Sequence, residues 1–222
     1  MSDSLLNIET FVEPTFGENA FVVSTADERG ETAGWVIDPS FPPQVDQLLK
    51  YIREQSIGIE KIILTHGHAD HIAGLDRVHQ AHPQVRVLIG QGDRSMLADA
   101  NENLSAPFGM PLELSTPADG DLEPGMLLTL GQTAWQVLDT SGHSPGGRSL
   151  YCAPAGLVIV GDALFAGSIG RTDFPGSNHR QLISNIRRHL LTLPDDTAVY
   201  SGHGPVTFIG NERKSNPFLS DG

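Results

Sequence analysis

Three histidines and an aspartate crowd into one short stretch of the chain, "ILTHGHADHIAGL" at residues 63–75. Within it, His66, His68, Asp70 and His71 all lie between positions 66 and 71. Burying imidazole and carboxylate groups without partners is unfavourable, so such a dense cluster needs an explanation. Imidazole nitrogens are ligands of Zn, Fe, Ni and Cu, and a carboxylate extends the choice towards Mn. The cluster therefore predicts a metal site.

Three more side chains of the same types follow expected strands later in the chain: His143 in "DTSGHSPGG", Asp162 in "VIVGDALF" and His203 in "YSGHGPV". Taken singly, each is more simply explained as a cap or a hydrogen-bonded loop residue. Together with the cluster, they put five histidines and two aspartates at strand ends, where loops on a rigid scaffold usually carry binding residues. The other histidines lie on or beside expected helices and are interpreted as solvated or hydrogen-bonded side chains: His79, His82, His179 and His189.

Five histidines and two aspartates suffice to bind two divalent cations. Three histidines with a shared aspartate, and two histidines with two aspartates, would each leave a position for water, as in catalytic sites. Water between two metals about 3.5–4 Å apart becomes hydroxide near neutral pH and attacks a polarised carbonyl. Zn is the expected metal, with Fe or Mn as alternatives, because ligand type does not settle which metal the cell supplies. We therefore predict a hydrolase that works through a metal-bridging hydroxide.

The elements that must position these residues alternate along the chain. In the first half, three short strands are expected within residues 6–40, and a buried strand, "IEKIILT", leads directly into the histidine cluster. Apolar residues at helical spacing, together with flanking turn residues, predict the other elements. These are a helix over 42–58 that ends at Gly58, a helix over 73–83, a strand over 85–90, a short helix over 92–100, and a loop over 101–124.

The second half repeats this theme. Strands are expected over 125–130, 133–140, 148–153, 156–162 and 197–204, with one long helix over 178–193. Blocks of strands that each close with a helix predict an α/β fold of two similar halves, with sheets inside and helices outside. Because no low-complexity linker divides the chain, residues 1–222 are expected to form a single domain.

The composition is that of an acidic globular protein, with 39% hydrophobic residues and 14 basic against 27 acidic residues, a net charge of −13. This charge argues against nucleic acid or an anionic membrane as the main partner. The single Cys152 excludes an intrachain disulfide and is interpreted as an inert, half-buried strand thiol. With no apolar run of ~18 residues and no amino-terminal signal, a cytoplasmic protein with a small-molecule substrate is expected. The oligomeric state is left open.

The motifs "THGHADH", "GHSPGG", "GDALF" and "GHGPVT", in this order, resemble those of the metallo-β-lactamase superfamily over nearly the whole chain. The resemblance implies a four-layer αββα sandwich. It also implies a ligand set: His66, His68 and His143 for the first metal, Asp70, His71 and His203 for the second, and Asp162 as the bridging carboxylate.

From Gly161 onwards, the chain is most similar to short bacterial glyoxalase II-like hydrolases. This resemblance implies hydrolysis of a thioester such as S-lactoylglutathione, whose thiolate leaves with a pKa of about 8.5–9 and needs little general-acid help. Asp70 or Asp162 would orient the attacking hydroxide. Arg171 matches a position that presents a basic residue to glutathione, with an ion pair to Asp173 as the alternative. Full-length glyoxalase II adds a C-terminal helical domain that this chain is expected to lack, so a broader thioester or ester preference stays open.

A persulfide dioxygenase is the main alternative, because it shares the "HADH" cluster and the "GRTDF" stretch. Such an enzyme oxygenates its substrate at a single iron, for which the corresponding ligands here would be His66, His143 and Asp162. Against it, "SGHGPVT" is more similar to the hydrolase ending. His71 and the lack of a cysteine ligand argue against a two-zinc lactamase. A metal-binding protein without turnover is disfavoured because all seven ligand positions are filled.

Overall fold

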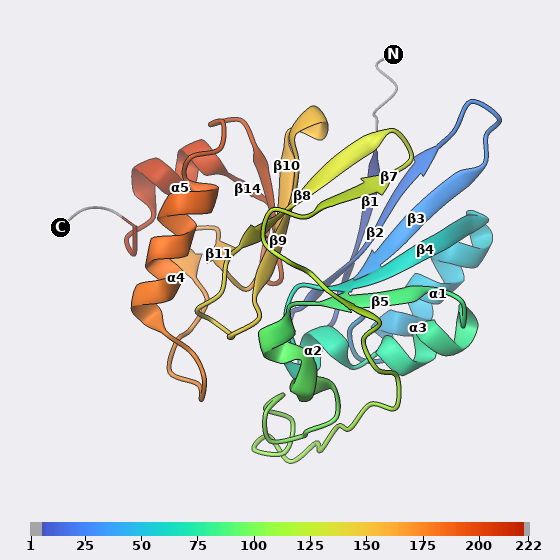
Figure 1. The fold of residues 1–222 in the computed structure, drawn as a ribbon, viewed down its shortest axis with the longest axis horizontal. Coiled ribbons are helices and arrows are strands. Elements are labelled where there is room, and N and C mark those ends of the chain that lie inside the picture. Colours follow the sequence, from blue (N-terminus) through green and yellow to red (C-terminus); the bar gives the residue numbers. More distant parts are fainter. Residues whose placement is uncertain (1–5, 220–222) are drawn as a thin grey trace.

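The computed structural model describes residues 6–219, so the amino-terminal stretch on which no secretory signal is expected lies partly outside the described residues. Two six-stranded sheets lie against each other, and helices cover their outer faces (Figure 1). This four-layer αββα arrangement confirms the fold class expected from the sequence. Within residues 6–219, no helix is both long and apolar enough to cross a membrane.

The first sheet has the strand order β1-β2-β3-β4-β5-β6. Strands β1 to β3 are antiparallel, whereas β3 to β6 are parallel neighbours, so their carboxyl ends meet at one edge. Helices α1 (Gln44–Glu54) and α3 (Leu75–Ala81) cover its outer face (Figure 1). The strands are β1 (Asn7–Val12), β2 (Asn19–Ala26), β3 (Thr32–Ile37), β4 (Ile57–Leu64), β5 (Arg86–Ile89) and β6 (Gly120–Asp121).

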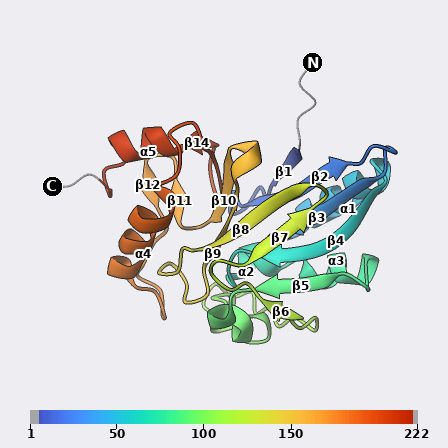
Figure 2. The ribbon, with the colours of Figure 1, turned by 45° about the horizontal axis from the view of Figure 1, so that its top comes forward.

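The second sheet has the order β14-β13-β10-β9-β8-β7, with β10 and β13 parallel and the other pairs antiparallel. Its outer face is covered by α4 (His179–Asn185), which continues as a π-helical turn over Ile186–Leu190, and by α5 (Ile209–Ser215) (Figure 2). The strands are β7 (Leu127–Leu130), β8 (Thr133–Asp139), β9 (Arg148–Cys152), β10 (Leu157–Gly161), β13 (Ala198–Ser201) and β14 (Thr207–Phe208). A small hairpin joins β11 (Leu164–Phe165) to β12 (Ser168–Ile169).

The period of two along each strand divides the apolar side chains among three cores. In β3, Trp35 and Ile37 lie between the two sheets, whereas Val36 packs under the helices of the first sheet. Trp35 meets Trp135 of the second sheet with ring centroids 5.6 Å apart. A third core lies between the second sheet and α4. Burial on both faces holds the sheets rigid, and so fixes the strand ends from which the candidate ligands emerge.

Two local expectations are wrong. The first helix ends at Glu54, not Gly58; the chain turns at Ser56, whose φ is +52°, and Gly58 already lies in β4. The short helix expected over 92–100 is present as a 3₁₀-helix, η1 (Gln91–Leu97). Cys152 is fully buried rather than half-buried, and burial raises the pKa of its thiol.

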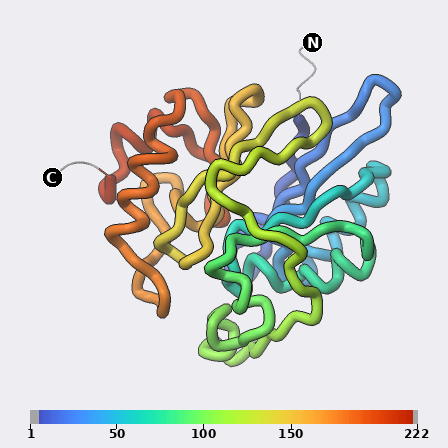
Figure 3. Tube along the Cα trace, viewed as in Figure 1, coloured from blue at the N-terminus to red at the C-terminus, as the bar shows by residue number. Residues whose placement is uncertain are grey.

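The expected loop after η1 is confirmed, apart from β6. Its first part, drawn in green in Figure 3, forms a protruding coil at one end of the molecule before the chain returns to the second sheet. Asn103 fixes the base of this coil by donating from Nδ2 to the carbonyls of Met96 and Leu112, both at 2.9 Å. The loop is therefore an ordered wall rather than a loose connection.

Candidate metal centre

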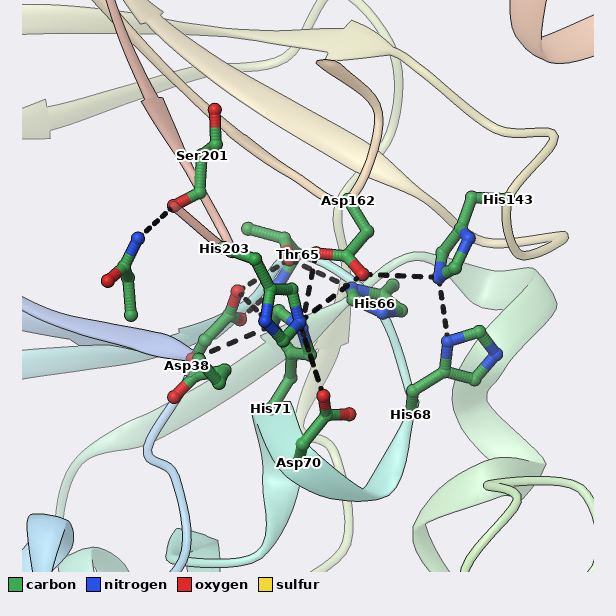
Figure 4. A network of polar contacts seen from close by, with 12 residues as sticks. Asp38, Thr65, His66, His68, Asp70, His71, His143, Asp162, Ser201 and His203 are labelled. Atoms are coloured by element: carbon green, nitrogen blue, oxygen red, sulfur yellow. Dashed lines mark hydrogen bonds and ion pairs between the residues drawn. The ribbon is translucent and has the colours of Figure 1, made fainter. Parts of the chain in front are cut away.

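The structure brings all seven candidate ligands to the carboxyl ends of four strands (Figure 4). His66 and His68 follow β4, and the short helix α2 (Ala69–Ile72) carries Asp70 and His71. The sequence predicted only a loop here; the single helical turn brings Asp70 and His71 to the same side as the later ligands. His143 follows β8, Asp162 follows β10, and His203 follows β13. The expected convergence of these side chains is present, while their roles as ligands remain predictions.

Among three triads of possible ligand atoms in the described residues, two share no residue and lie side by side, and the third, of Asp38, His66 and His71, overlaps both. Nitrogens of His66, His68 and His143 lie within 4.8 Å of one another. The second triad, Asp70, His71 and His203, meets the same limit. These are the two ligand sets that the resemblance implies, and together with Asp162 we call them the metal cluster.

Asp162 lies between the two triads. Its Oδ1 is 3.3 Å from Nε2 of His71, and its Oδ2 is 3.6 Å from Nε2 of His143. The same Oδ2 is 3.5 Å from Nε2 of His203. A single carboxylate thus faces imidazoles of both triads, which is the placement that a bridging ligand requires.

Hydrogen bonds on the far side of four imidazoles turn the other ring nitrogen of each towards the cluster, where Nε2 of His143 lies 2.8 Å from Nδ1 of His68. Nδ1 of His143 donates to the Arg171 carbonyl at 2.7 Å, and Nδ1 of His203 to the Phe16 carbonyl at 3.2 Å. Nδ1 of His71 lies 3.0 Å from Asp38, and Nδ1 of His66 lies 3.2 Å from the Thr65 hydroxyl. A ring nitrogen that donates outwards leaves the other one as a lone pair, which is the usual setting of a metal-bound histidine.

Several inward-facing atoms have no hydrogen-bond partner within the described chain. They are Nε2 of His66, Nε2 of His71 and Oδ1 of Asp162, all buried. Buried polar atoms are rarely left unpaired in folded proteins, so three of them around one point fit a site built for cations. Gly202 keeps this space open, because a Cβ there would collide with Asp162 Oδ1 and with the His71 ring.

The protonation states of His66, His68 and Asp162 also suit cation binding, whereas burial is outweighed at His71 and His203 by the carboxylates around them, which raise the pKa of these two rings, so a cation must displace a proton there. Burial lowers the pKa of His66 well below its ordinary value, and burial together with His143 lowers the pKa of His68 to about 3, so both rings are neutral. Burial alone would raise the pKa of Asp162, but His71 and its neighbours outweigh that effect and lower it well below the ordinary value. Neutral imidazoles and an ionised carboxylate are the forms in which these side chains bind metals.

Two buried aspartates that the sequence analysis missed hold the ligands in place. Asp38, at the end of β3, accepts hydrogen bonds from the Thr65 amide at 2.7 Å and the Thr65 hydroxyl at 2.6 Å, in addition to its contact with His71. Asp93, on η1, accepts from the Gly67 amide at 3.1 Å and the Ser144 hydroxyl at 2.6 Å. Asp93 therefore joins the loop that carries His66 and His68 to the loop that carries His143. For Asp38, a strand-end acid before a proline was the available signal.

A cavity of about 380 Å³ opens onto the metal cluster. Asp70, Asp162 and three of the histidines line its polar side. The rest of its wall is dominated by large apolar side chains, which we call the aromatic mouth: Phe16, Phe41, Phe108, Met110, Phe165 and Phe174. The arrangement combines a polar, metal-binding end with an apolar substrate space, which is typical of a small-molecule enzyme site.

Arg171 lines the same cavity, and it also forms the expected ion pair with Asp173. Its Nε and a terminal nitrogen donate to the two carboxylate oxygens at 2.9 and 2.7 Å. The guanidinium lies 4.3 Å from the centre of the Phe174 ring. The ion pair is thus present, and a contact between Arg171 and a substrate remains a prediction.

Comparison with known proteins agrees with this geometry. A family model described as the metallo-beta-lactamase superfamily matches residues 14–203. The chain is 43% identical over 171 residues to a probable metallo-hydrolase, YqgX, of Bacillus subtilis, covering 77% of this chain and 81% of that protein. It is 32% identical over 216 residues to the hydroxyacylglutathione hydrolase GloC of Haemophilus influenzae, covering 97% and 99%.

Two solved structures are similar throughout. The BLEG-1 B3 metallo-beta-lactamase has a TM-score of 0.88 and 34% identity, covering 97% of this chain and all of that one. TTHA1623, solved in a di-iron-bound form, has a TM-score of 0.81 and 32% identity, covering 95% of this chain and all of that one. With the family model matching most of its length, the chain belongs to the metallo-beta-lactamase superfamily.

Proposed function

We propose that this protein is a metal-dependent hydrolase of thioesters, similar to glyoxalase II, that uses two divalent cations. The single observation that carries the proposal is the pair of adjacent ligand triads with Asp162 between them, at the inner end of one cavity. The similarity to the Haemophilus influenzae hydroxyacylglutathione hydrolase, over nearly the whole of both chains, supports the thioester class.

His66, His68 and His143 would hold one cation, and Asp70, His71 and His203 the other, with Asp162 shared. Bound there, two divalent cations would polarise the substrate carbonyl and lower the pKa of water at the site. Hydrolysis joins the water oxygen to the acyl carbon and breaks the carbon–sulfur bond, so that sulfur leaves as a thiolate. Asp70 and Asp162 both line the cavity. Either carboxylate can orient the water, and the proton that the water loses ends on solvent or on the departing thiolate.

Within residues 6–219, the cavity lining offers no further general acid. Among the lining residues outside the metal cluster, Arg171 is the only ionisable side chain, and its guanidinium is already paired with Asp173. A thiolate leaves without prior protonation, whereas an amine or alkoxide does not. The make-up of the cavity therefore favours a thioester over an amide or a simple ester.

β-Lactam hydrolysis is the second candidate, because the BLEG-1 B3 metallo-beta-lactamase is 34% identical to this chain. The single-iron dioxygenase, which is the alternative from the sequence, is less favoured, since a second triad lies beside the residues that it would need. The test is an assay of S-lactoylglutathione, other thioesters and a chromogenic β-lactam on one preparation of known metal content. The proposal predicts thioester cleavage that disappears with chelation and returns with Zn, Fe or Mn. Oxygen uptake with a persulfide, without thioester cleavage, would contradict it.

A further inference from the structure

The walls of the cavity differ sharply from its metal-binding end. Phe16 and Phe41 stack on one side with ring centroids 5.6 Å apart, and Phe165 lies 6.0 Å from the His203 ring. On the other side, Phe174 lies 5.6 Å from the ring of His68 and 6.2 Å from that of His143. Aromatic side chains thus adjoin candidate ligands of both triads, so any group beside the reacting carbonyl meets apolar surface.

The loop after η1 completes this wall. Phe108 and Met110 line the cavity, yet 59% and 42% of their surfaces remain exposed. The loop is shaped to present them: the Met110 amide donates to the Ser105 carbonyl at 3.0 Å, and Gly109 between them has a φ of +77°. Large apolar side chains held exposed at the opening of a cavity are typical of a surface that a ligand covers.

Positive charge is scarce in the cavity. Outside the metal cluster, the only cationic side chain among its lining residues is Arg171, and both carboxylate oxygens of Asp173 already bind that guanidinium. Its planar face is also covered, since it lies over Phe174. Glutathione carries two carboxylates, and removing a carboxylate from water without a partner is unfavourable. The net charge of −13 gives no compensating long-range attraction.

We propose that the preferred substrates are small thioesters that carry a phenyl-sized or branched aliphatic group and no carboxylate near the reacting carbonyl. This inference rests on the proposed function and narrows it. The aromatic mouth would bind the apolar group and exclude water from it, while the metal cluster faces the thioester. A cavity of about 380 Å³ suits a ligand of this size.

Four thioesters separate the two properties. Phenylacetyl and lactoyl groups are each joined to glutathione and to N-acetylcysteamine, a thiol without carboxylates, and kcat/KM is measured on the metal-loaded protein. We expect kcat/KM for phenylacetyl-N-acetylcysteamine to exceed that for S-lactoylglutathione by at least about tenfold. The change of acyl group and the change of thiol should each contribute to this difference. Equal values, or a preference for S-lactoylglutathione, would overturn the inference and leave thioester hydrolysis standing. Failure to cleave any of the four would overturn the proposed function, and the inference with it.

A variant at the opening tests the aromatic mouth itself. Phe108→Ala should raise KM for phenylacetyl-N-acetylcysteamine about tenfold, and should change KM for the two lactoyl compounds much less. Phe218→Ala is the matched control, because Phe218 is similarly exposed, at 49%, but does not line the cavity. An equal effect of Phe108→Ala on all four substrates would contradict a contact with the apolar group.

Binding gives a readout that does not depend on turnover. The thioether S-phenethyl-N-acetylcysteamine cannot be hydrolysed, and its Kd can be measured by calorimetry on both metal-free and metal-loaded protein. We expect it to bind at least about tenfold more tightly than S-methylglutathione in both states, and Phe108→Ala to remove most of the difference. Equal affinity for the two thioethers would contradict the inference.

Discussion

The metal cluster and the aromatic mouth share one cavity but are built in opposite ways. The cluster is mostly buried, and hydrogen bonds of its rings to Asp38, the Thr65 hydroxyl and two backbone carbonyls fix their orientation. The mouth is partly exposed and comes from several separate segments, and its own side chains are apolar, so that only backbone and neighbouring polar groups fix it in place. From this difference we infer that rigid, hydrogen-bonded ligands determine the chemistry. The side chains of the aromatic mouth would determine substrate choice, and they can be substituted without disturbing the metal cluster.

The largest effect is expected from His68→Ala, which removes a nitrogen from the first triad. Thioester cleavage should fall to the uncatalysed rate and bound metal should decrease, while the fold is kept because His68 lies outside the three apolar cores. Metal analysis, turnover and circular dichroism on one sample measure all three. Asp46→Ala is the control, since this carboxylate pairs with Arg77 on the surface. Unchanged turnover in His68→Ala would contradict the role given to the metal cluster.

A smaller loss is expected from Asp38→Asn, a change outside the proposed ligand set. The amide keeps the size of the side chain but removes the charge that faces Nδ1 of His71. Partners of this kind typically contribute 10–100-fold in metal affinity, so the metal Kd should rise by about that factor. Competition with a coloured chelator measures it. A metal Kd equal to that of the unchanged protein would mean that the contact of Asp38 with His71 does not affect metal affinity.

These two positions show how far the sequence alone could be interpreted. The seven clustered residues and the layered fold were predictable, because strand ends and motif spacing are local features. Asp38 was not, since its role depends on Thr65 and His71 across the sheet, far along the chain. The aromatic mouth was missed for the same reason: its phenylalanines come from segments far apart in the chain, and nothing local distinguishes them from core residues.

A change at the mouth should alter selectivity rather than chemistry. Asp173→Asn removes the charge that neutralises Arg171, so the guanidinium becomes available to an anionic substrate. The ratio of kcat/KM for S-lactoylglutathione to that for the same acyl group on N-acetylcysteamine should rise several-fold. Assay of the two substrates at low and high salt measures it, since added salt should reduce the gain. An unchanged ratio would mean that Arg171 takes no part in substrate recognition.

The smallest effect concerns the loop that carries Phe108. Asp76 of α3 accepts hydrogen bonds from the Ser115 amide at 2.9 Å and the Thr116 amide at 2.9 Å. Burial alone would raise the pKa of Asp76, but these hydrogen bonds outweigh burial and lower it. A lowered carboxyl pKa stabilises the fold above the pKa of the unfolded chain, and this contribution is lost as the pH falls through the folded value. In Asp76→Asn, the free energy of unfolding should therefore fall slightly less between pH 5 and pH 3 than in the unchanged protein, as measured by urea titration. The same decrease in both proteins would show that the hydrogen bonds of Asp76 contribute nothing to the pH dependence of stability.

The central claim is that seven side chains hold two cations that act together on a thioester. The most direct test is to add metal stepwise to the metal-free protein, and to measure bound metal and thioester cleavage at each step. We expect saturation at two divalent ions per chain, with full turnover only when both are bound. Saturation at a single iron, with oxygen uptake and no hydrolysis, would contradict it.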